Sequence, residues 1–295
     1  MRVHHGGKNG DLIYSLPVIK ALSRVHGKIT LVTSPLCFQL VPLLWEQPYL
    51  QDVEMDYSQA YKIDDHGCMD PWQVLSPEEG INLSPQPAMF RHNAPVSWTH
   101  AYAEIAGIGP LTVKDRVALP SLWNHRQWFW EHNVETEGKD KVTRTWKPPL
   151  TCVLAPESET LKTIPLRYWW KVAAKLQGEF TVIVVGAKPD GGSFGGFNLR
   201  DLRGLTTVPS MARILAEATL VIAANSLPWH LARHAGTPTF CFQDQYIERC
   251  TPVDTPYAFY TAEQWERMAE DAILFAKKPV TTLWNPKDLK ELEAA

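Results

Sequence analysis

The feature that most constrains the fold of this chain is the regular alternation of apolar and amphipathic segments in its second half. Short runs rich in Val, Ile, Leu, Ala and Phe predict strands at 150–155, 180–185, 219–224 and 238–242. Apolar residues at helical spacing predict helices at 166–177, 208–218, 227–235 and 262–277. Strictly alternating strands and helices with short connections predict a parallel, doubly wound α/β sheet.

The N-terminal segment predicts a second unit of the same kind. A short strand at 1–5 runs into a glycine-rich turn at 6–11, and the apolar residues from Leu12 to Leu22 then recur at helical spacing. Asp11 is placed to cap that helix, and Pro17 predicts that the helix starts late or kinks there. The first half therefore opens with a strand, a loop and a helix.

The rest of the first half is less regular. A strand rich in β-branched residues follows at 29–33, whereas residues 57–98 are richer in Pro, Asp and Ser and are expected to form loops and short helices. A short helix is predicted at 99–107, with Thr99 as its cap and Gly107 as its terminating residue.

Length indicates two domains, because single cores stop growing at roughly 250–300 residues and this chain has 295. The charged segment 137–149 ends in two prolines and almost bisects the chain, which makes it the best linker candidate. We expect Rossmann-like domains at 1–143 and 144–295 that face a central cleft, with the last helix packing back on the first domain.

Composition excludes several classes of protein. Hydrophobic residues make up 45% of the chain and charged residues 21%, which excludes a disordered chain, a fibre and a coiled coil. The net charge of −3 does not favour binding to nucleic acid, which is itself negatively charged. No apolar run is long enough to span a membrane, and the N-terminus lacks the apolar segment of a signal peptide. Five cysteines without CxxC spacing predict reduced, mostly buried thiols. We therefore expect a cytoplasmic enzyme or binding protein.

Three loops are placed to bind a ligand, because ligands of open α/β sheets bind outside the carboxyl ends of the strands. They are the glycine-rich turn 6–11, the polar loop 157–165 with Lys162, and the segment 225–230 that precedes a helix. Asn225 and Ser226 can cap that helix or present its N–H groups to a phosphate. From the pattern alone, each loop has a structural alternative: a turn with a capping aspartate, a solvated lysine, or a packed histidine at 230.

Taken together, these segments resemble the lipopolysaccharide heptosyltransferases of glycosyltransferase family 9, which have the two-domain GT-B fold. The resemblance lies in Gly10-Asp11 with the following Leu-Pro…Leu helix, in Lys162-Thr163-Ile164-Pro165, in Asp201-Leu202-Arg203-Gly204, and in Asn225-Ser226…His230-Leu231-Ala232 followed by Gly236-Thr237-Pro238-Thr239. The sequence departs from the family pattern at Asn225, Leu227 and Ile164, where the family has Asp, Gly and Trp. Residues 57–135 match no motif of the family.

The resemblance implies an inverting, metal-independent transfer of a sugar from a nucleotide-sugar donor, with no cofactor. It makes Asp11 the general base and places Gly10, Glu157, Ser158, Lys162, Thr206, Asn225, Ser226 and His230 at the donor. The acceptor would meet Lys8, Asn9 and the polar cluster Arg91, His92 and Asn93. The acceptor can be a glycan, a lipid-linked saccharide or a modified base in DNA.

Three alternatives stay open. A GT-B nucleotide-sugar epimerase would share the donor site without an acceptor pocket. A non-catalytic nucleotide-sugar binding protein is a second alternative, and a glycosyltransferase that acts on hydroxymethylated pyrimidines in DNA is a third. The sequence leaves open the donor base, the sugar, the acceptor and the oligomeric state.

Overall fold

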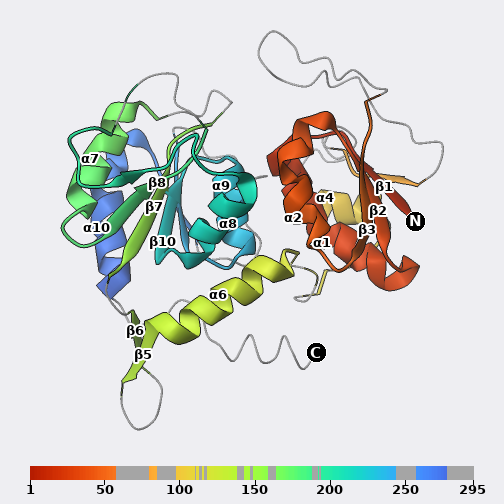
Figure 1. Cartoon of the computed structure of the whole chain (residues 1–295), viewed down its shortest axis with the longest axis horizontal. Coiled ribbons are helices and arrows are strands. Elements are labelled where there is room, and N and C mark those ends of the chain that lie inside the picture. Colours follow the sequence, from red (N-terminus) through yellow and green to blue (C-terminus); the bar gives the residue numbers. More distant parts are fainter. Residues whose placement is uncertain are drawn as a thin grey trace. The chain divides into compact units, whose positions relative to one another are not determined.

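A computed structural model describes most of the chain as two compact units. The described residues are 1–57, 80–84, 98–109, 111, 112, 115, 118–137, 143–146, 149–158, 164–187, 192, 194–243 and 257–277; at 127–137, 143–146 and 257 the description covers the backbone alone. Described residues up to Ser121 form the first unit and those from Leu122 onward form the second (Figure 1).

The second unit is built on a six-stranded sheet in the order β12-β11-β10-β7-β8-β9. Its strands are β7 (Thr151–Ala155), β8 (Thr181–Val184), β9 (Arg200–Asp201), β10 (Leu220–Ala223), β11 (Thr239–Phe242) and β12 (Tyr257–Tyr260). Every neighbouring pair is parallel. The predicted parallel, doubly wound sheet is confirmed, and β9 and β12 add edge strands that the sequence pattern did not indicate.

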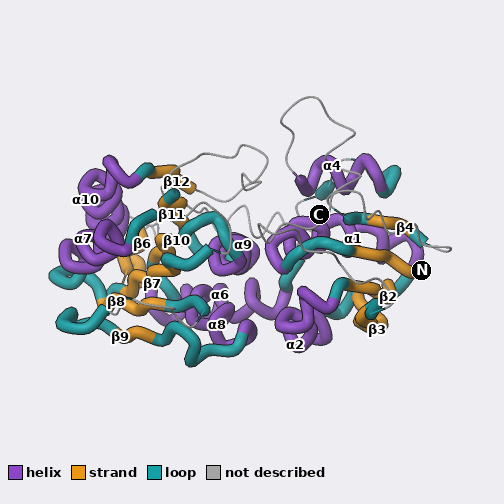
Figure 2. Tube along the Cα trace, turned by 90° about the horizontal axis from the view of Figure 1, so that it is seen from above, coloured by secondary structure: helices purple, strands orange, loops and turns teal. Residues whose placement is uncertain are grey.

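Helices cover both faces of this sheet (Figure 2). They are α7 (Leu166–Leu176), α8 (Val208–Glu217), α9 (Leu227–His234) and α10 (Trp265–Lys277), the last preceded by the 3-10 turn η3 (Ala262–Gln264). Helices α7 and α10 pack together, whereas α8 and α9 contact each other. Helix α10 contributes Met268 and Ala272 to the core of the second unit.

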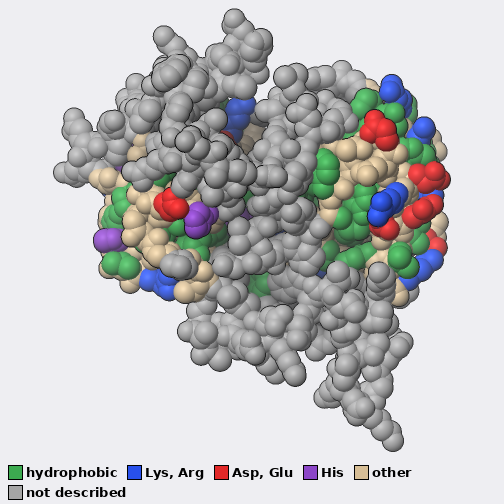
Figure 3. Space-filling view, turned by 180° about the vertical axis from the view of Figure 1, so that it is seen from behind, with side chains coloured by type: hydrophobic (Ala, Val, Ile, Leu, Met, Phe, Trp, Pro, Cys, Tyr) green, Lys and Arg blue, Asp and Glu red, His purple; other side chains and the backbone are tan. Residues whose placement is uncertain are grey.

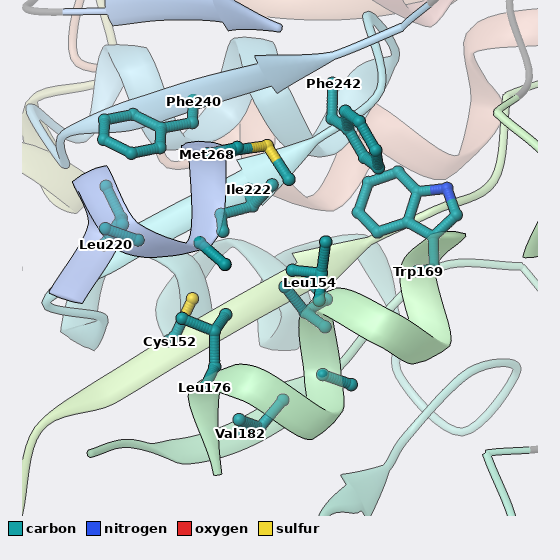
Figure 4. Close-up of a cluster of buried hydrophobic side chains, with 14 of the residues drawn as sticks. Cys152, Leu154, Trp169, Leu176, Val182, Leu220, Ile222, Phe240, Phe242 and Met268 are labelled. Atoms are coloured by element: carbon teal, nitrogen blue, oxygen red, sulfur yellow. The ribbon is translucent and has the colours of Figure 1, made fainter. Parts of the chain in front are cut away.

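The core between the sheet and the helix pair α7–α10 is fully apolar in its centre (Figure 4). Leu154, Leu220 and Ile222 are 0% exposed, and the ring of Trp169 meets the ring of Phe242 edge-on at 5.0 Å between centroids. Each such side chain contributes about 1.5–3 kcal/mol to the free energy of unfolding. This packing holds the strand ends, which carry the candidate site, in fixed positions.

The first unit contains a smaller parallel sheet in the order β3-β2-β1-β4. Its strands are β1 (Arg2–His5), β2 (Ile29–Thr33), β3 (Leu50–Met55) and β4 (Ile81–Asn82). Its helical segments are α1 (Asn9–His26), the 3-10 turn η1 (Pro35–Leu40), α2 (Val41–Trp45) and α4 (Trp98–Ile105). The predicted strands at 1–5 and 29–33 are confirmed.

Helix α1 excludes the late start that Pro17 suggested, and it places Asp11 inside its first turn. It runs without interruption from Asn9 to His26 with Pro17 inside, so it does not start late. The residues around Pro17, among them Leu16 and Val18, are 0% exposed. Burial of this whole segment outweighs the roughly 3 kcal/mol that an internal proline costs. The residue before the helix is Lys8, so Asp11 lies in the first turn and is not the N-cap.

For the short helix α4, the predicted terminating residue is confirmed and the predicted capping residue is not. Thr99 lies inside the helix and does not cap it; its hydroxyl donates to the carbonyl of Tyr14 at 3.0 Å and ties α4 to α1. Gly107 follows the helix with φ of 66°, a conformation that favours glycine and ends helices.

An antiparallel hairpin lies within the second unit. It consists of β5 (Val134–Glu137) and β6 (Thr143–Trp146). Helix α6 (Pro120–Asn133) precedes it, and its Arg126 donates to the carbonyls of Ala216 and Ala218 at 3.0 and 2.6 Å. This buried guanidinium satisfies the C-terminus of α8 and holds α6 to the second unit.

Candidate functional site

Each sheet has one topological switch point, where the chain changes the direction in which it adds strands. In the first unit it lies between β1 and β4, and in the second unit between β7 and β10. Doubly wound sheets bind ligands in the crevice at the carboxyl ends of such strands. Four segments flank the two switch points, namely 6–11 and 83–84 in the first unit and 156–158 and 224–226 in the second.

Hydrogen bonds close the switch point of the first unit. The N–H of Gly6 donates to Ser84 Oγ at 2.8 Å, which joins the end of β1 directly to the end of β4. The thiol of Cys37 donates to the carbonyl of Gly7 at 3.3 Å. Burial raises the pKa of that thiol to about 12, so Cys37 acts as a neutral donor. The glycine-rich turn is therefore a fixed element.

The buried ring of His5 packs beneath this turn and bonds to its backbone. It is 0% exposed, and its Nδ1 accepts from the N–H of Gly7 at 3.1 Å. Because Nδ1 accepts, the neutral ring carries its proton on Nε2. Burial lowers the pKa of His5 to about 3, so the ring is uncharged at neutral pH. Its role in the described structure is to orient the backbone that leads to Asp11.

Asp11 lies in the first turn of α1, where its Oδ2 accepts from the N–H of Lys8 at 3.1 Å. A helix N-terminus favours a negative side chain, which explains locally why aspartate is found here. Lys8, Asn9, Gly10 and Asp11 are all half-buried, so the carboxylate keeps some access to solvent. The structure thus brings together four of the residues predicted from the sequence.

Three charged groups form a network beside the second switch point. The guanidinium of Arg203 donates from Nε and Nη2 to both oxygens of Asp201, at 2.9 and 2.7 Å. Its Nη1 donates to Glu157 Oε1 at 2.8 Å, and its plane lies 4.8 Å from the centre of the Phe194 ring. Only 2% of the Arg203 side chain is exposed, so this arginine links the ends of β7 and β9 from inside the fold.

Gly186, two residues after the end of β8, makes room for the carboxylate of Glu157. A Cβ at this position would lie 2.1 Å from Glu157 Oε2, and the φ of Gly186 is 145°. Oε2 is buried and has no hydrogen-bond partner, whereas Oε1 is held by Arg203. Burial raises the pKa of Glu157, and the neighbouring Arg203 opposes that shift.

The N-terminus of α9 offers fewer backbone donors than the sequence suggested. Ser226 precedes the helix, Pro228 has no N–H, and the N–H of Trp229 donates to the carbonyl of Ser226 at 3.0 Å. Asn225 is buried at the end of β10, and the buried ring of His230 lies 5.3 Å from that of Trp229. A phosphate at this helix would therefore depend more on side-chain charge than on the helix itself.

For the remaining predicted residues, the structure describes few contacts or none. Ser158 follows Glu157 and is half-buried; Thr206 is also half-buried and precedes Thr207, whose hydroxyl accepts from the N–H of Ser210 at 3.4 Å. Lys162, Arg91, His92 and Asn93 lie outside the described residues. Sequence reasoning missed the roles of Arg203, Gly186, His5 and Ser84. Only Arg203 and Gly186 carried a signal, because one lies in a recognised motif and the other directly follows a predicted strand.

On the face shown in Figure 3, acidic and basic side chains are interspersed on the described surface of the second unit. Within the described part of the chain, no group of three or more His, Cys, Asp or Glu residues could hold a metal ion. A search of the described helices found none with the length and apolar character needed to cross a membrane.

Sequence comparisons give no family for this chain: no family model matches it, and no curated protein does. Solved structures do match over almost the whole chain. The glycosyltransferase of family 9 from Veillonella parvula has a TM-score of 0.62 at 13% identity, over 92% of this chain and 97% of that one. E. coli heptosyltransferase WaaC with ADP has a TM-score of 0.60 at 12% identity, over 92% and 99%.

A third structure, E. coli ADP-heptose lipopolysaccharide heptosyltransferase II, has a TM-score of 0.54 at 12% identity, over 94% of this chain and 98% of that one. At such identities the likeness establishes the fold. The α/β class and the GT-B architecture predicted from the sequence are confirmed, and the structure is similar to family 9 glycosyltransferases.

Proposed function

We propose that this protein is a glycosyltransferase that moves a sugar from a nucleotide-sugar donor to an acceptor hydroxyl. The observation that carries the proposal is the placement of acidic side chains at both switch points of a GT-B fold: Asp11 in the first unit and Glu157 in the second. The fold is that of glycosyltransferases, and its switch points are where ligands of doubly wound sheets bind.

In this proposal Asp11 is the general base. An acceptor hydroxyl is a weak nucleophile at neutral pH, so a carboxylate that takes its proton as it attacks the anomeric carbon speeds the reaction. The turn that carries Asp11 is held by the bonds from Gly6 to Ser84 and from Gly7 to His5. A fixed turn supports this role because general-base catalysis depends on position. By analogy with family 9, the transfer inverts the anomeric configuration.

The departing nucleoside diphosphate would meet the second unit. Its negative charge needs a positive partner, and the first turn of α9 has no N–H at Pro228 and uses that of Trp229 internally. We therefore assign the main electrostatic role to Lys162, with Ser158, Thr206, Asn225, Ser226 and His230 around the donor. No cofactor or metal is part of the proposed reaction.

The acceptor side of the proposal rests on the first unit. Lys8 and Asn9 lie beside Asp11, and Arg91, His92 and Asn93 belong to the polar stretch that we assign to acceptor recognition. Solved neighbours include a heptosyltransferase with ADP and one with ADP-2-deoxy-2-fluoro heptose. We propose a nucleotide-sugar donor of this general class and a glycan or lipid-linked saccharide as acceptor.

A two-step experiment tests this function. Thermal denaturation with a panel of nucleoside diphosphates should show a higher Tm with one base, since ligand at about 100 times its Kd adds roughly 2.7 kcal/mol. The matching nucleotide sugars are then incubated with candidate acceptors, with and without EDTA. We expect a glycosylated product that survives the chelator. Conversion of the donor without any acceptor would favour the epimerase, and binding without turnover would favour a binding protein.

A further inference from the structure

The carboxylate of Glu157 is held in a more specific way than a surface glutamate at a loop. Arg203 donates a hydrogen bond to Glu157 Oε1 at 2.8 Å. The guanidinium of Arg203 also donates to Asp201, and to the carbonyl of Gly192 at 3.2 Å. On the other side, the bare backbone of Gly186 touches the second oxygen. Four chain segments thus converge to keep one carboxylate at the end of β7.

The side chain of Glu157 stays 28% exposed, whereas that of Arg203 is 2% exposed. Oε2 is itself buried against Gly186 and has no hydrogen-bond partner, so a ligand does not reach it in this conformation. Oε1 accepts from Arg203, and a carboxylate oxygen can accept two hydrogen bonds. Oε1 therefore has capacity for a donor from outside the described residues.

We propose that Arg203 and Gly186 are positioning residues that hold the Glu157 carboxylate as an acceptor for an O–H or N–H group of the donor nucleotide. This inference rests on the proposed function. An ionised carboxylate and a diphosphate both accept hydrogen bonds and repel each other, so Glu157 is unsuited to the phosphates. The nucleotide carries donors in two places, the ribose hydroxyls and the N–H groups of the base, and Glu157 pairs with one of them.

The first test compares Glu157→Gln with the unchanged chain by isothermal titration. The probes are the nucleoside diphosphate that binds best among ADP, UDP, GDP and CDP, its 2′-deoxy form, and inorganic pyrophosphate. Gln can still accept from Arg203, but it loses the negative charge. We expect about tenfold weaker binding of the nucleoside diphosphate, because hydrogen bonds to charged groups are among the stronger ones. Binding of pyrophosphate should be unchanged.

The probes also show whether the ribose 2′-hydroxyl is the donor group. If it is, the 2′-deoxy form binds the unchanged chain about as weakly as the ribose form binds Glu157→Gln. If the 3′-hydroxyl or a base N–H is the partner, both forms lose affinity equally in the variant. Tighter binding of pyrophosphate and nucleoside diphosphate alike in Glu157→Gln would overturn the inference, because the carboxylate would then only oppose the phosphates.

The positioning roles need variants that spare Glu157. Gly186→Ala places a Cβ on Oε2 and should lower nucleoside diphosphate affinity without changing pyrophosphate affinity. Gly27→Ala is the matched control, because Gly27 also has positive φ, at 75°, but a Cβ there meets nothing within 4 Å. Arg203→Lys should act in the same direction and add nothing when combined with Glu157→Gln. Equal loss for pyrophosphate, or additive loss in the double variant, would reduce Arg203 to a structural residue.

The outcomes distinguish this inference from the function on which it rests. A chain that binds none of the four nucleoside diphosphates contradicts the proposed function and the inference together. A chain that binds one of them equally well with Glu and Gln at position 157 contradicts the inference alone. Melting temperatures of all variants, measured without ligand, identify any variant whose loss of affinity comes from unfolding.

Discussion

The two switch points have the same topology but opposite chemistry. In the first unit, neutral groups close the turn: the N–H of Gly6 bonds to Ser84, and His5 is held uncharged by burial. In the second unit, the ends of β7, β8 and β9 meet around the charged network of Glu157, Arg203 and Asp201. One topology thus supports a rigid neutral turn in one place and a charged cradle in the other.

This difference shows how one fold can place a base on one sheet and a nucleotide site on the other, as proposed above. A catalytic carboxylate profits from a rigid scaffold, and Asp11 is the acidic residue on the first turn of α1. The proposed nucleotide site must instead balance charge, because it would receive an anion. Arg203 pairs with Glu157 and Asp201 while only 2% of its own side chain is exposed, so these two carboxylates add less negative charge there.

The largest expected effect is at Asp11. Asp11→Asn should lower the rate of transfer by about 10²–10⁴-fold, because the amide cannot take the proton of the acceptor, while nucleoside diphosphate affinity stays the same. The amide oxygen can still accept from the N–H of Lys8, so the Tm should change little. Asp52→Asn is the matched control, because Asp52 is an exposed aspartate of the same unit. A fully active Asp11→Asn chain would remove Asp11 from the mechanism.

Lys162 comes next and probes the second unit. Lys162→Ala should weaken nucleoside diphosphate binding by about tenfold or more, since a charge-assisted hydrogen bond contributes about 1.5–3 kcal/mol. Lys171→Ala, at an exposed position of α7, serves as the control in the same titration. Unchanged nucleoside diphosphate affinity in the Lys162→Ala variant would mean that this lysine is solvated and that another group balances the charge of the diphosphate.

Ser84 tests the rigidity of the first switch point. Ser84→Ala removes the acceptor of the buried Gly6 N–H and should lower the free energy of unfolding by about 1–3 kcal/mol in urea denaturation. Ser23→Ala is a fair comparison, because Ser23 Oγ only donates to the carbonyl of Lys20 on the helix surface. Equal stability of the two variants would show that the turn does not depend on this bond.

The smallest expected effect is a pH dependence at His5. Its pKa falls from 6.5 to about 3 on folding, so between these values the unfolded chain binds a proton that the folded chain does not. Stability is therefore lost as the pH falls below 6.5, by at most about 1.4 kcal/mol per pH unit. The Tm gap between the natural chain and His5→Asn should narrow from pH 7.5 to pH 5.5. A gap in Tm that stays constant between these two pH values would contradict this.

Much of the fold could be predicted because periodicity reflects burial. The predicted strand 219–224 is apolar after Thr219 because both faces of the sheet are covered, and the structure places β10 there with four buried residues. Features that depend on partners distant in sequence could not be predicted. The two-residue strand β9 is too short for a pattern, and helix α1 continues through Pro17 only because its surroundings bury it.

The candidate site was predictable to a different degree in each unit. The glycine-rich turn and Asp11 follow from their place after a strand; Asp11 caps the helix from its first turn, where its carboxylate accepts from the N–H of Lys8, and not from the N-cap position. The role of Arg203 depends on Glu157, 46 positions away in the sequence, and no local pattern reveals such a pairing. The prediction that Thr99 caps α4 was wrong for the same reason, because its hydroxyl donates to the carbonyl of Tyr14 on another helix.

The most direct test of the division between the two units is amide hydrogen exchange with and without the nucleoside diphosphate that binds best. We expect slower exchange in the peptides that contain Ala155–Ser158 and Ala223–His230, at the carboxyl ends of β7 and β10, on addition of the nucleotide. Slower exchange confined to the first unit, in the peptides around Gly6–Asp11, would contradict this division, because the donor would then bind beside the proposed base.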